Sequence, residues 1–179
     1  MAPSTKSAIN SPRFLCDEML QRLGSWLRAA GYDTRIARDG EDDYQLLRQA
    51  IEQGRFLITR DRELARHRRA AGTVILLKAD NLEDCAEALC EKLAINWLMA
   101  PFSRCMGCNT PLIDATPQQI QRLPLTKKDH IDAAFYCPTC RQVFWEGSHV
   151  KRMRQHLSDW ARKYSTDISA DSAFTLWSD

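Results

Sequence analysis

Along the first hundred residues, short apolar runs alternate with stretches in which apolar residues recur every three or four positions. The runs occupy residues 14–16, 34–37, 56–59 and 74–77. Short apolar runs predict buried strands, and the three-to-four spacing predicts amphipathic helices. Strands that alternate with helices are typical of an α/β fold, in which a parallel sheet is flanked by helices.

Helical spacing follows each of the four runs. The predicted helices begin near Asp17, Asp43, Asp61 and Asn81, and Gly31 ends the first of them. The third helix is basic and extends to residue 71. The apolar faces of the other three are formed by Leu20, Leu23, Leu27 and Ala30, by Leu46, Leu47, Ala50 and Ile51, and by Leu82, Cys85, Leu89 and Leu93.

Two Cys-x-x-Cys pairs follow in the second half of the chain, with 28 residues between them: Cys105 with Cys108 and Cys137 with Cys140. Four thiolates can close a tetrahedral zinc site that keeps no open position for chemistry. Two disulfides are the alternative, but paired Cys-x-x-Cys motifs without a secretion signal favour zinc. We therefore expect a zinc ribbon with a structural Zn²⁺, and we look for catalysis upstream of it.

A basic amphipathic helix is predicted after the ribbon. Its apolar stripe consists of Val150, Met153, Leu157 and Trp160. Three bases, Lys151, Arg152 and Arg154, lie off this stripe. The predicted order is a disordered tail at 1–12, the α/β domain at 13–100, the ribbon with its helix at 101–164, and a polar acidic tail at 165–179.

The composition points to the cytoplasm. Residues 1–12 are rich in Ser and Pro and contain no apolar run, so the sequence predicts neither a signal peptide nor a membrane span. The three other cysteines, Cys16, Cys85 and Cys90, occupy apolar positions, where we expect buried, reduced thiols.

Charge is unevenly distributed, although the net charge is only +2. Residues 13–100 contain 14 Lys and Arg against 15 Asp and Glu, whereas residues 101–164 contain 10 against 5. A basic zinc module beside an acid-containing domain suggests a polyanion that one part holds and the other processes. A solvated basic surface is the alternative interpretation.

Aspartates stand where the predicted strands end. Asp17 and Asp61 follow two strands, Asp43 opens the helix between them, and Asp80 lies just beyond the last strand. In parallel sheets, ligands bind beyond the carboxyl ends of the strands. Converging carboxylates suit Mg²⁺ or Mn²⁺, which can activate water for attack on a phosphate. The alternative is that these acids cap helices.

Basic residues cluster next to Asp61. On a continuous helix Arg62, Arg66 and Arg69 would share one face, which together with Arg60 could carry phosphates toward the carboxylates. A solvated helix face is the alternative.

These motifs resemble a family, the PIN-like RNase domain named for the C-terminal region of the worm protein Mut-seven. The resemblance rests on ordered segments that together span most of residues 13–157, namely 14–20, 22–33, 43–47, 57–61, 103–109 and 137–149.

The resemblance implies a PIN-like nuclease fold with an appended zinc ribbon, and divalent-metal cleavage of RNA. It assigns metal-binding carboxylates to Asp17, Asp43 and Asp61. Asp42 is a neighbouring candidate because the two adjacent aspartates leave the alignment ambiguous by one residue. Asp80 matches no firm position of the motif.

Two functional hypotheses follow. The first is a metal-dependent ribonuclease that uses Mg²⁺ or Mn²⁺ at the carboxylates, with a zinc ribbon that aids RNA binding. The second is a non-catalytic module, built on the zinc ribbon, that binds nucleic acid or protein. The pattern fits either RNA or single-stranded DNA as the substrate. It also fits either endonuclease or exonuclease action.

Overall fold

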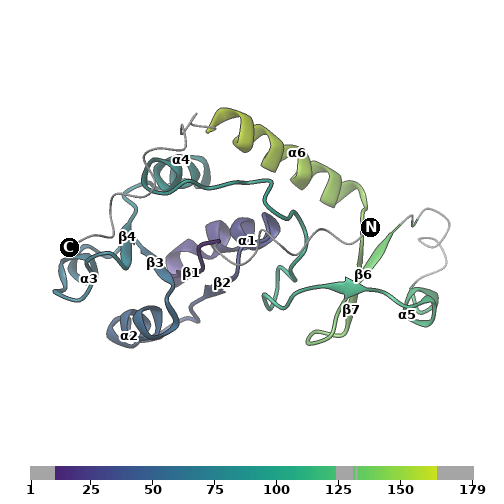
Figure 1. Cartoon of the computed structure of the whole chain (residues 1–179), viewed down its shortest axis with the longest axis horizontal. Coiled ribbons are helices and arrows are strands. Elements are labelled where there is room, and N and C mark those ends of the chain that lie inside the picture. Colours follow the sequence, from purple (N-terminus) through teal and green to yellow (C-terminus); the bar gives the residue numbers. More distant parts are fainter. Residues whose placement is uncertain (1–10, 124–130, 132, 165–179) are drawn as a thin grey trace.

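The computed structural model describes residues 11–123, 131 and 133–164 of the 179-residue chain. This part contains a four-stranded sheet and a separate three-stranded sheet (Figure 1). The acidic tail expected at 165–179 lies outside the described residues, as does nearly all of the disordered tail expected at 1–12. No helix in the described part is long and apolar enough to span a bilayer.

The larger sheet is parallel throughout, as predicted. Its strands are β1 (Phe14–Cys16), β2 (Thr34–Ile36), β3 (Phe56–Thr59) and β4 (Val74–Leu76), in the order β2-β1-β3-β4. From β1 the chain first moves outward to β2 and then returns to the other side of β1 as β3. The strand order therefore reverses between β1 and β3, and such reversals open a crevice at the carboxyl ends of the strands.

Helices cover both faces of this sheet. The 3₁₀ turn η1 (Glu18–Leu20), α1 (Gln21–Ala29) and α4 (Leu82–Lys92) lie on one face, and α2 (Asp43–Gln53) and α3 (Arg62–Arg66) lie on the other. The strands supply alternate residues to the two layers: Phe14 and Cys16 pack with α1 and α4, whereas Leu15 packs with α2.

Two residues explain where α1 ends and where α4 begins. Gly31 ends the first helix with φ +103°, and a Cβ atom there would lie 2.5 Å from the carbonyl oxygen of Ala100. Asn81 caps α4, because its side chain accepts a hydrogen bond from the backbone N–H of Asp84 at 2.9 Å. The predicted apolar face of α2 is wrong at one position, because Ile51 is 43% exposed.

The basic helix is shorter than predicted. α3 ends at Arg66, because His67 is extended and the chain turns back toward β4. The N–H of Ala70 donates to the carbonyl oxygen of His67 at 2.8 Å, and Ala70 is buried against the domain. Arg69 therefore lies outside α3 and does not share a helical face with Arg62 and Arg66.

The second sheet is antiparallel and consists of β5 (Ile113–Asp114), β6 (Ala134–Cys137) and β7 (Gln142–Trp145). A short helix, α5 (Pro117–Gln121), follows β5. In Figure 1 these elements form a unit to one side of the parallel sheet.

The last helix, α6 (Ser148–Lys163), runs from the ribbon back toward α4 (Figure 1). Its residues Met153, Leu157 and Trp160 are buried in the core that also contains the inner faces of α1 and α4. The Trp160 ring lies 4.6 Å from that of Trp97 and 5.2 Å from that of Trp26. The predicted stripe is thus a packing surface for the α/β domain.

Candidate functional site: carboxylates at the sheet edge and a cysteine cluster

Asp17 follows β1 at the crevice between β1 and β3. Its backbone N–H donates to the carbonyl oxygen of Ile58 at 3.0 Å, which fixes it beside β3. The side chain is only 7% exposed, and its Oδ2 accepts a hydrogen bond from the Thr59 hydroxyl at 2.9 Å. Although Asp17 precedes η1, its carboxylate makes no capping hydrogen bond. Helix capping therefore does not explain this buried acid.

Asp61 has a structural role and lies close to the same place. Its Oδ1 accepts hydrogen bonds from the N–H groups of Glu63 at 2.6 Å and Leu64 at 3.3 Å, which caps α3. The N–H of Asp61 donates to the Thr59 hydroxyl oxygen at 3.0 Å. Thr59 thus joins Asp61 to Asp17. The sequence analysis missed Thr59, for which the only signal is a hydroxyl at the last position of an apolar run.

The adjacent acids Asp42 and Asp43 occupy different environments. Asp42 caps α2, because its Oδ2 accepts a hydrogen bond from the Gln45 N–H at 2.9 Å. Burial raises the pKa of Asp43, and the negative charges of Asp17 and Asp61, together with a hydrogen bond to Asp61, raise it further. The structure thus brings Asp17, Asp43 and Asp61 together, while Asp42 caps the helix.

Asp80 does not join these three acids. Its side chain is 89% exposed and forms an ion pair with Arg60. A different acid, Glu18, lines the same hollow of about 290 Å³ as Asp17 and Asp43, and its Oε2 accepts a hydrogen bond from the Gly40 N–H at 2.9 Å. Glu18 was not among the expected site residues. Its position directly after Asp17 was the available signal.

The carboxylates form an open group of ligands. Among the described residues, the four ribbon cysteines are the one group of acids, histidines and cysteines packed closely enough to enclose a metal ion. Mg²⁺ commonly keeps several waters and takes one or two carboxylates from a protein, so it does not require a closed cage. Oxygen ligands at the crevice therefore fit Mg²⁺ or Mn²⁺ and do not fit a closed zinc site.

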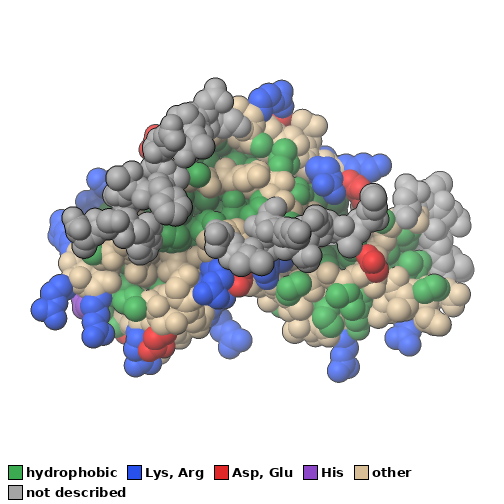
Figure 2. Space-filling model, in the orientation of Figure 1, with side chains coloured by type: hydrophobic (Ala, Val, Ile, Leu, Met, Phe, Trp, Pro, Cys, Tyr) green, Lys and Arg blue, Asp and Glu red, His purple; other side chains and the backbone are tan. Residues whose placement is uncertain are grey.

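The expected phosphate contacts are distributed over several elements. Arg62, Arg66 and Arg69 are exposed, and Figure 2 shows Lys and Arg side chains over the end of the molecule that carries α2 and α3. Arg60 is held by Asp80. On α6, Lys151 and Arg152 are exposed, whereas Arg154 pairs with Glu146 at 3.0 Å and stacks on the ring of Phe102.

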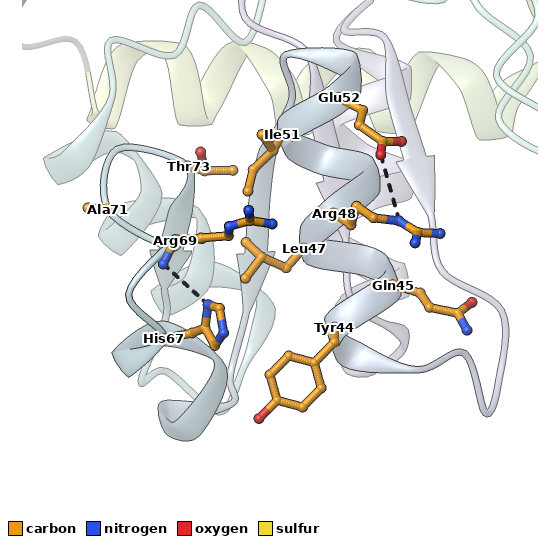
Figure 3. A pocket seen from close by; sticks show the side chains of 10 residues that line it. All are labelled: Tyr44, Gln45, Leu47, Arg48, Ile51, Glu52, His67, Arg69, Ala71 and Thr73. Atoms are coloured by element: carbon orange, nitrogen blue, oxygen red, sulfur yellow. Dashed lines mark hydrogen bonds and ion pairs between the residues drawn. The ribbon is translucent and has the colours of Figure 1, made fainter.

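Arg69 lines a separate hollow of about 790 Å³ between α2 and the segment that leads to β4. Figure 3 shows its side chain extending toward Leu47 and Ile51 of α2. The backbone N–H of Arg69 donates to Nδ1 of His67 at 3.2 Å, and the His67 ring meets the edge of Tyr44, which is 64% exposed.

The four ribbon cysteines form a compact cluster. Their sulfur atoms all lie within 4.8 Å of one another, with Cys105 and Cys140 at 3.9 Å and Cys108 and Cys137 at 3.4 Å. Zn–S bonds of about 2.3 Å in a tetrahedron place sulfurs about 3.8 Å apart. Since no described cysteine forms a disulfide, the donor set and its spacing fit a zinc ion.

Hydrogen bonds within this cluster shift the pKa values of its thiols. Burial opposes ionisation of Cys108, but hydrogen bonds with Thr110 and the neighbouring thiols outweigh it and lower its pKa to about 6. Hydrogen bonding with Cys108 is the largest of the effects that raise the pKa of Cys140 to about 12. Cysteine thiols must lose their protons to bind a metal, so metal binding to this cluster would release protons.

The first cysteine knuckle is attached to the parallel sheet. The buried guanidinium of Arg28 donates to the carbonyl oxygens of Thr34, at 2.8 Å, and of Met106 and Gly107, at 2.8 and 2.9 Å. The side chain of Asn109 accepts a hydrogen bond from the Thr34 N–H at 3.0 Å. The knuckle therefore covers part of the open edge of β2.

Comparison with known proteins identifies a nuclease family. Residues 12–157 match a family model described as the Mut7-C RNAse domain. A human protein named Exonuclease mut-7 homolog is 32% identical over 101 residues, which cover 54% of this chain and 12% of that protein. No solved structure matches the chain significantly.

Proposed function

Because the chain belongs to the Mut7-C RNAse domain family, we propose that it is a divalent-metal-dependent ribonuclease with its active site at Asp17, Asp43 and Asp61. The observation that carries this proposal is the environment of Asp17. Its carboxylate is buried at the crevice where the strand order reverses, caps no helix, and lies near two further acids. Such an arrangement is costly without a cation.

The carboxylates would each contribute to metal binding in a different way. A bound Mg²⁺ or Mn²⁺ would polarise the phosphate and lower the pKa of a water ligand. Thr59 holds Asp17 in one orientation through its hydroxyl. Asp61 uses Oδ1 to cap α3, so Oδ2 is the atom with which it would bind the ion. Hydrolysis would add the water oxygen to phosphorus and break the bond between phosphorus and the leaving ribose oxygen, which takes up a proton in place of the one that the water releases.

The parallel sheet and the position of its acids support a PIN-like fold. We propose a structural Zn²⁺ held by Cys105, Cys108, Cys137 and Cys140. The exposed bases Lys151 and Arg152 support a role for the ribbon and its helix in RNA binding. The free thiols of Cys16 and Cys85, which lie in the core, support a cytoplasmic location.

A second candidate function is a non-catalytic binding module. It is favoured by the capping roles of Asp42 and Asp61 and by the ion pair of Asp80, because each gives an acid a purely structural purpose. Asp17 is the residue that this alternative leaves unexplained.

Cleavage assays distinguish the two functions. Metal-stripped protein is incubated with labelled RNA and labelled single-stranded DNA before and after addition of Mg²⁺ or Mn²⁺. We expect RNA cleavage only after metal addition, and its loss in Asp17→Asn with a melting temperature equal to or above that of the wild type. Asp42→Asn is the matched control, since asparagine also caps helices well. RNA cleavage by Asp17→Asn at the wild-type rate would overturn the nuclease function.

A further inference from the structure

A groove of about 1050 Å³ runs beside β2, the edge strand of the parallel sheet. One wall is formed by the segment from Arg35 to Asp39, and the other is formed by the knuckle residues Met106 to Cys108. Gln21 and Arg28 of α1 lie along its floor. We refer to this feature as the β2 groove.

The β2 groove is continuous with the candidate active site. The hollow that contains Asp17 and Asp43 and the β2 groove are both lined by Ala37, Arg38 and Glu41. A chain bound at the carboxylates can therefore pass directly into the groove and reach the first knuckle.

The lining of the groove contains three arginines, Arg28, Arg35 and Arg38, and two acids, Asp39 and Glu41. Arg38 presents an exposed side chain at the junction with the hollow. Arg35 pairs with Glu41 through Nη2, whereas its Nη1 is buried without a hydrogen-bond partner among the described residues. Because that atom is enclosed, Arg38 is the side chain here whose guanidinium is open to a phosphate.

A peptide strand added to the free edge of β2 is a less suitable occupant. Edge strands bind peptides through their unpaired backbone groups. Here the Thr34 N–H donates to Asn109 Oδ1 and the Thr34 carbonyl oxygen accepts from Arg28, so the start of this edge is already occupied.

We propose that the β2 groove binds the single-stranded RNA segment next to the scissile phosphate and directs it toward the first cysteine knuckle. This inference rests on the proposed nuclease function. Arg38 would contact a phosphate of that segment, while the carboxylates hold the phosphate that is cleaved.

The test measures how RNA length affects variants of Arg38. Arg38→Ala and Arg38→Glu are compared with wild-type protein in cleavage of a dinucleotide and of single-stranded RNAs of increasing length. Binding of the same RNAs is measured in the Asp17→Asn background, which separates affinity from turnover. Because the Arg38 side chain is exposed, we expect unchanged melting temperatures.

We expect the affinity for long RNA to fall about tenfold in Arg38→Ala, as for a lost charge-assisted hydrogen bond, and further in Arg38→Glu. The penalty should grow with RNA length. Lys92→Ala is the charge-matched control, since Lys92 is exposed at the end of α4 and lines neither the groove nor the hollow. It should behave as wild type.

The outcomes separate the groove from the nuclease function. Suppose that the wild-type protein cleaves long RNA and that Arg38→Glu has the same affinity and rate. RNA binding in the β2 groove would then be wrong, while the nuclease function would stand. A penalty that is the same for the dinucleotide and for long RNA would also overturn RNA binding in the β2 groove. Wild-type protein that cleaves no RNA would instead overturn the proposed function.

Discussion

The hydroxyl of Thr59 donates a hydrogen bond to Oδ2 of Asp17 at 2.9 Å and accepts one from the N–H of Asp61 at 3.0 Å. One side chain at the end of β3 therefore fixes the carboxylate after β1 and the start of the loop that carries Asp61. Thr59 itself is fully enclosed.

Replacing Thr59 with valine should remove this link while keeping the shape of the strand residue. Because a buried acceptor and a backbone donor would each lose a partner, we expect the free energy of unfolding to fall by about 1–3 kcal/mol. In the cleavage assay, the valine variant should show a large fall in kcat and a smaller change in KM. Thr59→Ser is expected to recover most of the activity. Equal kcat in the valine variant and the wild type would contradict a positioning role.

Asp43 should make the stability of the metal-free protein depend on pH. Its pKa is raised in the folded state, so its favourable contribution is present below the ordinary Asp pKa and is lost as the pH rises through the raised value. In EDTA, and at pH values above the raised pKa, Asp43→Asn should therefore melt at a higher temperature than wild type. Mg²⁺ should raise the melting temperature of wild type more than that of the variant.

The control for Asp43 is its neighbour. Asp42→Asn retains a capping side chain and should follow the wild-type pH profile and response to Mg²⁺. If the two variants have the same pH profile, the separation of the roles of Asp42 and Asp43 is wrong.

The exposed arginines near Asp61 should contribute separately to RNA binding. Arg66 lies on α3 and Arg69 lies in the hollow of Figure 3, so they would contact different phosphates. Each alanine variant should lower the slope of log affinity against log salt by about 0.7, and the double variant by about twice that. Binding titrations at several salt concentrations measure this. An unchanged slope would leave these arginines as a solvated surface.

The cysteine cluster should contain one zinc ion per chain, and the metal should also steady the edge of β2. Cys105→Ser should lose the metal and loosen the ribbon, while the α/β domain stays folded. Because the Thr34 N–H donates to Asn109 just after the first knuckle, its hydrogen exchange should become faster in this variant. Cys90→Ser lies outside the cluster and should keep its zinc. Substoichiometric zinc in fresh wild-type protein would contradict the assignment.

The strands and the main acids could be predicted because burial and strand ends leave clear patterns in sequence. Asp17 is conspicuous as a charge directly after an apolar run. Thr59 is not, because a threonine at a strand end looks like any β-branched strand residue. The roles of Asp42 and Asp43 depend on a helix start that sequence patterns do not locate to one residue.

Tertiary contacts explain the remaining differences between the sequence predictions and the structure. The position of Arg69 follows from a turn in which Ala70 is buried, and the local basic pattern gave no sign of that turn. The link between Arg28 and the first knuckle joins residues almost 80 positions apart in the chain, and no periodicity reports such a contact.

The ribbon leaves and rejoins the α/β domain at the same helix. On leaving, the N–H groups of Ala100 and Phe102 donate to the carbonyl oxygens at the end of α1, and on return Trp160 of α6 packs on Trp26 of α1. A module anchored at both ends cannot swing as a tethered one does. The distance between the cysteine cluster and the carboxylates is therefore set by two anchors on one helix and not by a flexible linker.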